Sequence, residues 1–133
     1  MPTLERLTPD ALRRTVVTFR DAMVSHAPGI NRLNVYPVPD GDTGTNMART
    51  LDAVVAELDA APEGLVETCD AISHGSLMGA RGNSGVILSQ ILRGLAGTLK
   101  HAGEATASKV AEALRSASGA AYEAVLKPIE GTI

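Results

Sequence analysis

The sequence is nearly free of aromatic residues: of its 133 residues, one is phenylalanine, two are tyrosine and none is tryptophan. It also has no block of lysine or arginine, and 12 basic residues against 15 acidic ones give a formal net charge of −3. Proteins that bind nucleic acids use aromatic stacking platforms and positively charged surfaces. Because both are scarce here, we expect no nucleic-acid partner.

The chain has a single cysteine, Cys69, and no long apolar run. One thiol can form neither an internal disulfide nor a thiolate metal cluster, which favours a reducing compartment and a buried structural role for Cys69. A transmembrane helix needs about 18 or more apolar residues, and the start MPTLERLTPD lacks the pattern of a signal peptide. We therefore expect a cytoplasmic protein without a transmembrane segment, folded as one domain over residues 1–133.

Apolar residues recur at helical spacing in the first half of the chain. The stripe from Leu12 to Met23 follows the start signal Thr8-Pro9-Asp10, and we expect this helix to end at Pro28-Gly29. The prolines between there and residue 39 predict a stiff, extended loop. A second stripe predicts a helix that starts near Thr43 to Thr45 and ends at about Asp59.

The second half of the chain predicts three more helices. One is marked by Leu65, Cys69 and Ile72 and is interrupted by GARGNSG, residues 79–85. The next, VILSQILRGLAGTLK, is apolar over most of its circumference, which is typical of a helix packed on several sides. The last extends from Val110 to Val125 and should stop at Lys127-Pro128. About five helices and no alternating strand pattern predict an all-α fold.

Two aspartates, Asp40 and Asp42, flank Gly41 in the non-helical segment NVYPVPDGDTGTNM. Their carboxylates repel each other unless they are protonated or share a cation, and Gly41 would let the backbone turn so that both converge on one ion. Carboxylate oxygens suit Mg²⁺, Mn²⁺ or Ca²⁺. The alternative is an Asp-Gly turn followed by a helix N-cap, since the second predicted helix begins just after Asp42. The three residues Asp40-Gly41-Asp42 alone leave both interpretations open.

Several known signatures do not match these segments. In an EF-hand loop that starts at Asp40, Thr45 would replace the required glycine and Leu51 the required glutamate. Neither glycine-rich segment has the Gly-Lys-Ser/Thr of a P-loop, and the Rossmann glycine pattern and its strand are missing. The stretch GNSGV resembles a nucleophile elbow, but Val86 stands in place of its last glycine.

The two glycine-rich segments, GDTGTN and GARGNSG, both lie where a predicted helix begins. Helix N-termini present backbone N–H groups and the positive end of the helix dipole to anions, and glycines leave these groups accessible. Each segment alone is also ordinary helix punctuation. Together with the paired aspartates, they predict a site where Mg²⁺ and glycine loops bind phosphates, which is the equipment of phosphoryl transfer.

The motifs NVYPVPDGDTGTNM and GSLMGARGNSGVILSQILRG resemble the nucleotide-binding (DhaL-like) domain of the dihydroxyacetone kinase superfamily. Within it, they are most similar to the N-terminal domain of the ATP-binding subunit of bacterial fatty acid kinase. This resemblance implies an antiparallel up-and-down barrel, usually of eight helices, that binds Mg²⁺ and ATP at one end. With about five helices, the barrel would be incomplete, and uncovered apolar faces would promote self-association, for example as a homodimer.

Matched motif by motif, the resemblance implies three metal ligands: Asp40, Asp42 and, in place of a third aspartate, the amide oxygen of Asn34. It implies that phosphates contact one set of residues from each glycine-rich segment: Thr43, Gly44, Thr45 and Asn46, and Gly82, Asn83 and Ser84. Arg81 could neutralise phosphate charge or be an ordinary solvated arginine.

The resemblance also implies a function. The domain would bind Mg²⁺ and ATP in a kinase that transfers the γ-phosphate to a carboxylate, here a fatty acid presented by a separate lipid-binding protein, and it would be inactive alone. A carboxylate is already ionised at neutral pH, so we assign no catalytic acid or base. The alternatives are a dihydroxyacetone kinase-type ATP/ADP-binding domain, a non-catalytic nucleotide-sensing module, and a helical interaction domain that binds no ligand.

Overall fold

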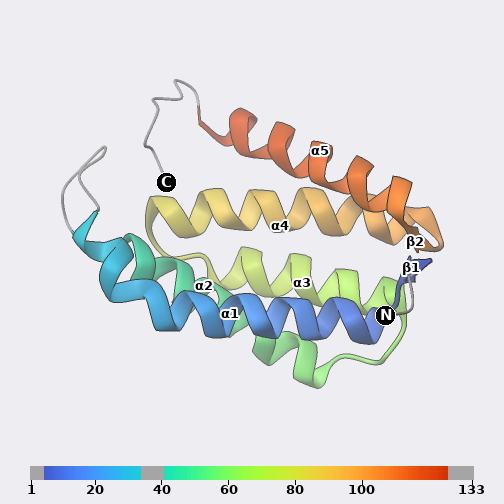
Figure 1. Ribbon diagram of the computed structural model, residues 1–133, viewed down its shortest axis with the longest axis horizontal. Helices are drawn as coiled ribbons and strands as arrows, with labels where there is room; N and C mark the ends of the chain where they lie inside the picture. Colours follow the sequence, from blue (N-terminus) through green and yellow to red (C-terminus); the bar gives the residue numbers. More distant parts are fainter. Residues whose placement is uncertain (1–4, 34–40, 126–133) are drawn as a thin grey trace.

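The computed structural model describes residues 5–33 and 41–125 and is almost entirely helical in these ranges (Figure 1). The helices are α1 (Pro9–Arg32), α2 (Thr43–Ala60), α3 (Leu65–Gly79), α4 (Gly82–Ala102) and α5 (Ala107–Ala124). Two-residue strands, β1 (Arg6–Leu7) and β2 (Ala105–Thr106), form one antiparallel pair. The all-α prediction is confirmed, and this short pairing is the one feature of the described residues that it lacked.

Consecutive helices run antiparallel and pack side by side in chain order, and α2 also packs on α4 (Figure 1). Because α2 and α4 are separated by one helix, they run parallel to each other and their N-termini lie at the same end of the bundle. The last helix, α5, packs mainly on α4. Closure into a barrel stays a prediction.

Most predicted helix starts agree with the structure. Thr8 caps α1, where its hydroxyl oxygen accepts a hydrogen bond from the Ala11 N–H at 3.1 Å, and Pro9 follows in the first turn. The second helix begins at Thr43, within the predicted range. The fourth begins at Gly82 rather than Val86, so the second half of GARGNSG is its first helical turn and not a loop. Helix α3 ends at Gly79, which leaves only Ala80 and Arg81 between the two helices.

The predicted end of α1 at Pro28-Gly29 is wrong, since the helix continues through Pro28 to Arg32. Proline lacks the N–H that a helix needs and disfavours a helical interior by about 3 kcal/mol. Contacts with α2 oppose this cost: Gly44 lies directly against the Ala27 backbone, and the Asn31 side chain bonds to α2. The predicted proline loop, which was to reach from Pro28-Gly29 to residue 39, is thus helical in its first part; its remainder from residue 34 and the stop at Lys127-Pro128 lie outside the described residues.

The core lies between α1, α2, α3 and α4. Its fully buried members include Leu51, Val54, Ile72 and Leu99. Cys69 is also fully buried, as predicted, and burial is the main cause that raises its pKa to about 11, with Asp70 adding to the shift. Because only the thiolate is reactive, this environment makes Cys69 an inert core residue at neutral pH.

Arg13 of α1 ties three helices together. Its guanidinium donates to the carbonyl oxygens of Leu58 at 2.7 Å and Ala61 at 3.2 Å, and also to that of Pro62. Its Nε donates to the buried hydroxyl of Thr68 in α3 at 3.1 Å. A cation at the C-terminal end of α2 is favourably placed, because that end carries unsatisfied carbonyls and the negative end of the helix dipole.

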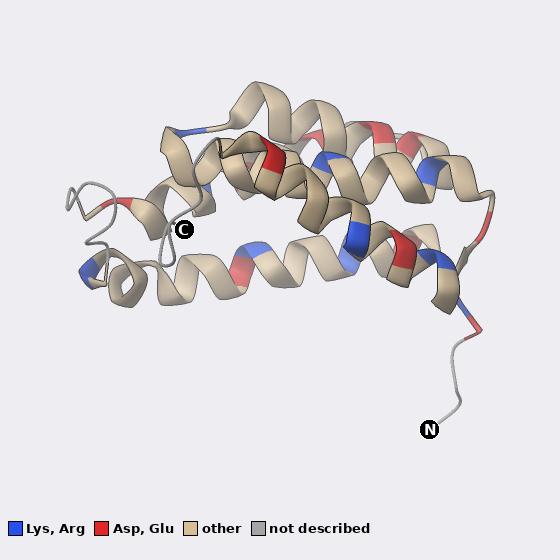
Figure 2. Cartoon of the chain, turned by 90° about the horizontal axis from the view of Figure 1, so that it is seen from above, with Lys and Arg blue, Asp and Glu red and all other residues tan. Residues whose placement is uncertain are grey.

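Acidic and basic residues are interspersed over the helices (Figure 2). Some form pairs between helices, such as Lys100 with Asp70 at 2.6 Å and Arg20 with Asp52 at 3.3 Å. The neighbouring Asp21 is the main cause that raises the pKa of Arg20. Exposed pairs of this kind typically contribute about 1 kcal/mol or less, so the apolar core and the Arg13 contacts matter more for helix packing.

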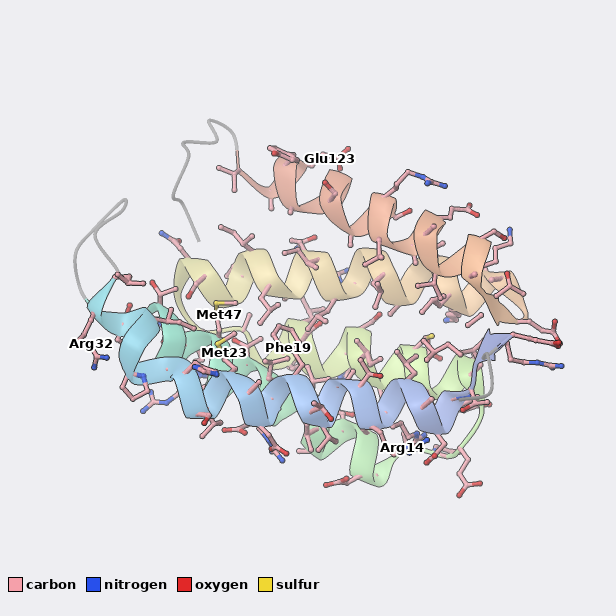
Figure 3. The ribbon with its side chains drawn as sticks, in the orientation of Figure 1. Arg14, Phe19, Met23, Arg32, Met47 and Glu123 are labelled. Atoms are coloured by element: carbon pink, nitrogen blue, oxygen red, sulfur yellow. The ribbon has the colours of Figure 1, made fainter. Side chains whose placement is uncertain are left out.

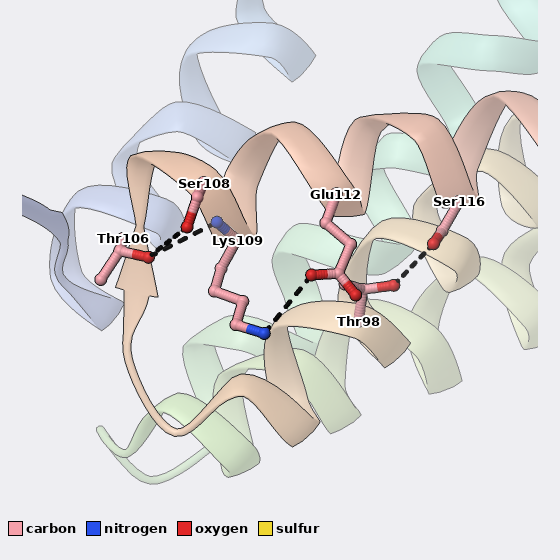
Figure 4. Close-up of polar contacts among 6 residues, drawn as sticks. All are labelled: Thr98, Thr106, Ser108, Lys109, Glu112 and Ser116. Atoms are coloured by element: carbon pink, nitrogen blue, oxygen red, sulfur yellow. Dashed lines mark hydrogen bonds and ion pairs between the residues drawn. The ribbon is translucent and has the colours of Figure 1, made fainter.

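Helix α5 is the least covered of the helices. Its buried face consists of small residues, Ala113 and Ala117, which pack on α4, while Leu114 and Tyr122 are 58% and 67% exposed. Polar contacts supplement this packing: Thr98 donates to Ser116 across the two helices at 2.9 Å (Figure 4). Apolar side chains are thus exposed on α5, and both the incomplete barrel and the homodimer stay predictions.

No helix in the described part of the chain combines the length and the apolar content that crossing a membrane requires.

The close approach of α2 and α3 depends on Gly75. A Cβ atom at this position would lie 2.9 Å from the Val54 Cα and 3.0 Å from the Ala53 carbonyl oxygen. We expect Gly75→Ala to lower the free energy of unfolding by about 1–3 kcal/mol, because the helix backbones must move apart. In the matched control, Gly97→Ala, the added methyl group meets no atom within 4 Å, so the better helix propensity of alanine should raise stability by up to about 1 kcal/mol. Urea denaturation of both variants measures the difference, and equal changes would contradict the packing argument.

Candidate functional site

The N-termini of α2 and α4 lie against each other at one end of the bundle, and each carries one of the glycine-rich motifs. Ser84 of α4 donates its hydroxyl to the Thr43 carbonyl oxygen of α2 at 3.3 Å. The side chain of Asn46, which lies in the first turn of α2, is next to Gly82 of α4. The structure therefore brings together the two segments that the sequence predicted would act jointly.

Position 82 sets two structural requirements, and glycine meets them better than any other residue type. Its φ of 66° lies in the left-handed region, which L-residues with a side chain rarely adopt. A Cβ atom here would also lie only 2.4 Å from Nδ2 of Asn46. Gly82 thus permits both the sharp entry into α4 and the contact between the two helix N-termini.

Thr50 is the polar anchor of this junction. Its side chain is fully buried, and its hydroxyl donates to the Asn46 carbonyl oxygen at 2.8 Å while it accepts from the Arg81 N–H at 3.2 Å. A Cβ atom on Gly85 would come within 2.5 Å of the same hydroxyl oxygen. One side chain in α2 therefore holds both the backbone before α4 and its first turn. Sequence analysis missed Thr50, although a threonine within the apolar stripe of α2 was a signal.

The first turn of α2 is also fixed to α1. A Cβ atom on Gly44 would lie 2.6 Å from the Ala27 carbonyl oxygen, so only glycine allows this approach. Asn31 makes two hydrogen bonds to Thr45: its Nδ2 donates to the hydroxyl oxygen at 2.9 Å, and its Oδ1 accepts from the backbone N–H at 3.1 Å. Sequence analysis missed Asn31 because it assigned this residue to a loop.

The predicted phosphate-contacting residues all lie in the first turns of these two helices. Those of α2, Thr43 to Asn46, surround the buried Gly44, and those of α4 extend from Gly82 to the buried Ser84. Asn83 is exposed between them. The adjacent Arg81 is exposed too, and its guanidinium donates to the Ala80 carbonyl oxygen at 3.2 Å. The set therefore combines backbone amides, small hydroxyls and one nearby cation at two positive helix ends.

Of the three predicted metal ligands, Asp42 alone falls in the described residues; Asn34 and Asp40 lie outside them. Asp42 occupies the N-cap position of α2, where its carbonyl oxygen accepts from the Asn46 N–H at 2.8 Å and its side chain makes no capping hydrogen bond. Within the described ranges, no three His, Cys, Asp or Glu residues gather as a metal-binding group. The donor types still fit magnesium, which prefers a few carboxylate or amide oxygens and completes its shell with water and phosphate.

The Thr50 anchor can be tested by comparing two substitutions. We expect Thr50→Val to lower the free energy of unfolding by about 1 kcal/mol, because the Arg81 N–H loses its acceptor, the buried Thr50 hydroxyl. It should also speed hydrogen exchange of the Arg81 amide measured by NMR. Thr50→Ser keeps the hydroxyl and should leave that amide protected, although it loses a buried methyl group. Equal protection of Arg81 in both variants would contradict the anchoring role.

Comparison with known proteins places the chain in a family. The family model of the DAK2 domain matches residues 37–133, which include both glycine-rich motifs. Protein YloV of Bacillus subtilis is 46% identical over 109 residues, which cover 81% of this chain and 20% of that protein. An uncharacterized protein of Staphylococcus saprophyticus is 47% identical over 113 residues, with 82% and 20% covered.

The chain thus spans about one fifth of the length of these curated relatives. The family match covers most of the chain and agrees with the resemblance to the dihydroxyacetone kinase superfamily that the motifs suggested. The chain therefore belongs to the DAK2 domain family.

Proposed function

We propose that this domain binds ATP and Mg²⁺ in a kinase that transfers the γ-phosphate to a carboxylate, namely a fatty acid presented by a separate lipid-binding protein. Membership in the DAK2 family makes it a dihydroxyacetone kinase-like nucleotide-binding domain. The metal, the catalytic activity and the acceptor are the additional parts of the proposal.

The contact between the N-termini of α2 and α4 is the observation that carries the proposal. Each helix end bears a partial positive charge of about half a unit and N–H groups that are unsatisfied within the helix. Two such ends side by side favour a ligand with several negative charges spread over a short length. A chain of phosphates has this character, and Gly44 and Gly82 keep bulky side chains out of the junction.

The residues divide into two roles in this proposal. Asp40, Asp42 and Asn34 would hold Mg²⁺, and the first turns of α2 and α4 would hold the phosphates. When bound, the ion would neutralise part of the phosphate charge. Thr43, Thr45 and Ser84 contribute hydroxyls, and Asn46 and Asn83 contribute amides that can donate to phosphate oxygens. Arg81 adds a full positive charge at the edge of the same junction.

The proposed acceptor follows from the chemistry and from the resemblance. A carboxylate is ionised at neutral pH and attacks phosphorus without losing a proton, whereas a hydroxyl acceptor such as dihydroxyacetone requires a proton acceptor. The residues that we assign to phosphate binding are neutral amides and hydroxyls, which are poor proton acceptors. The preference for a carboxylate over the dihydroxyacetone-type alternative therefore rests mainly on the resemblance.

Nucleotide binding is tested by calorimetry. We expect the chain to bind ATP in the presence of Mg²⁺ and far more weakly when the metal is chelated. Asp40→Asn or Asp42→Asn should lower the affinity by about 100-fold or more, since changes that merely disturb ligand orientation already cost about 10- to 100-fold. The matched control is Asp59→Asn, which removes the same charge from an exposed position at the other end of α2. Unchanged affinity in both site variants, with the fold intact, would refute the metal assignment.

The acceptor is tested with ATP labelled in the γ-phosphate. The chain alone should give no labelled product. A polypeptide as long as the curated relatives, supplied with a fatty acid on a lipid-binding protein, should produce a labelled species that hydroxylamine destroys, as expected of an acyl phosphate. Labelling of dihydroxyacetone instead would overturn the carboxylate proposal. ATP binding without transfer to either acceptor would favour the nucleotide-sensing alternative.

A further inference from the structure

The hydrogen bonds between Asn31 and Thr45 define the orientation of both side chains. The backbone N–H of Thr45 can only donate, so the Asn31 atom that it meets at 3.1 Å must be the carbonyl oxygen Oδ1. Nδ2 of Asn31 therefore faces the Thr45 hydroxyl oxygen, to which it donates at 2.9 Å. Because this oxygen is the acceptor in that bond, the hydroxyl proton of Thr45 is directed elsewhere.

This arrangement differs from that of two other helical threonines, Thr15 and Thr50. The hydroxyls of Thr15 and Thr50 each donate to the carbonyl oxygen four residues earlier, at 2.8 Å. Such back-bonding is the usual way in which a helical threonine uses its proton. Thr45 lies in the first turn of α2, so the residue four positions earlier, Gly41, is outside the helix. Its hydroxyl is instead an acceptor for Asn31 and keeps its proton for another partner.

We propose that Asn31 is a positioning residue that holds the Thr45 hydroxyl as a hydrogen-bond donor to a phosphate oxygen of the nucleotide. This inference rests on the proposed function. Phosphate oxygens only accept hydrogen bonds, so a hydroxyl is useful to them only when its proton points outward. Donors that are oriented before the ligand arrives need no reorganisation when it binds. Asn31 itself is neutral and acts through Thr45.

The alternative is that the Asn31 bonds only stabilise the contact between α1 and α2. The substitution Asn31→Asp separates the two roles. An aspartate of nearly the same shape still accepts from the Thr45 N–H, but its second oxygen accepts as well, so the Thr45 hydroxyl must turn inward and donate to it. The junction keeps two hydrogen bonds while the outward donor is lost.

The added negative charge requires a matched control, which Arg32→Gln provides. Arg32 is the next residue in α1, is exposed, and projects from the end of the helix (Figure 3). Its replacement changes the local charge by the same one unit without touching Thr45. The difference between Asn31→Asp and Arg32→Gln therefore isolates the hydrogen bond from the general electrostatic effect.

The experiment is a double-mutant cycle in which Mg²⁺-ATP affinity is measured by calorimetry and folding by thermal melting. Asn31→Asp should weaken binding about tenfold more than Arg32→Gln, the loss expected for one hydrogen bond to a charged group. Thr45→Val should weaken binding by a similar factor, and Thr45→Ser should restore most of it. In the Thr45→Val background, Asn31→Asp should lower the Mg²⁺-ATP affinity no more than Arg32→Gln does.

Each outcome separates this inference from the proposed function. If the unaltered chain does not bind Mg²⁺-ATP, the proposed function fails and this inference fails with it. Suppose that the unaltered chain binds, but Asn31→Asp lowers the affinity no more than Arg32→Gln does; then only the role of Asn31 is overturned. The same conclusion follows if Asn31→Asp lowers the affinity as much in the Thr45→Val background as in the unaltered chain. If Asn31→Asp does not fold, Thr45→Val decides: wild-type affinity in that variant overturns the inference.

Discussion

The contact between the N-termini of α2 and α4 is the constraint on which the candidate site depends. The two helices run parallel, so their positive ends meet and repel each other weakly. The structure holds them together through steric fit at Gly82 and through the buried Thr50 hydroxyl, which joins α2 to the Arg81 backbone. A site that keeps two positive helix ends together before any ligand arrives is prepared for an anion, because the repulsion between them is relieved when negative charge binds.

The same end of the bundle depends on α1, and in particular on the turn beyond Pro28. A helix that stopped at this proline would not place Asn31 beside Thr45. The first turn of α2 is thus supported from two sides, by α1 and by α4. The cost of a proline within a helix is about 3 kcal/mol, and its acceptance here indicates that contacts between helices decide where α1 ends.

The sequence predicted the features that depend on local patterns. Apolar stripes at helical spacing identified the helices, the Thr8-Pro9 signal located the start of α1, and the glycine-rich motifs located the helix ends that meet. It did not predict what depends on contacts between distant segments. Pro28 and Gly82 are locally helix breakers, and only the packing of α2 explains why helix surrounds the first and begins at the second. Asn31 was not predicted because its segment was assigned to a loop. Thr50 stands out as a polar residue in the apolar stripe of α2, but the stripe does not show which distant backbone its hydroxyl contacts. Asn34 and Asp40, two of the three predicted metal ligands, lie outside the described residues and stay predictions.

Charge explains why the proposed metal would be central to this site. Two helix N-termini supply together about one unit of positive charge, and Arg81 supplies one more at an exposed position where water screens it. The proposed ligands, a nucleoside triphosphate and an ionised carboxylate acceptor, would bring several negative charges to the same place, in a chain whose own net charge is −3. The helix ends are therefore able to orient phosphates but not to neutralise them. A divalent ion is the largest local charge that such a site can gain, and Asp42, one of the proposed metal ligands, is the N-cap of α2; in the proposal it would link the ion to the helix end that orients the phosphates.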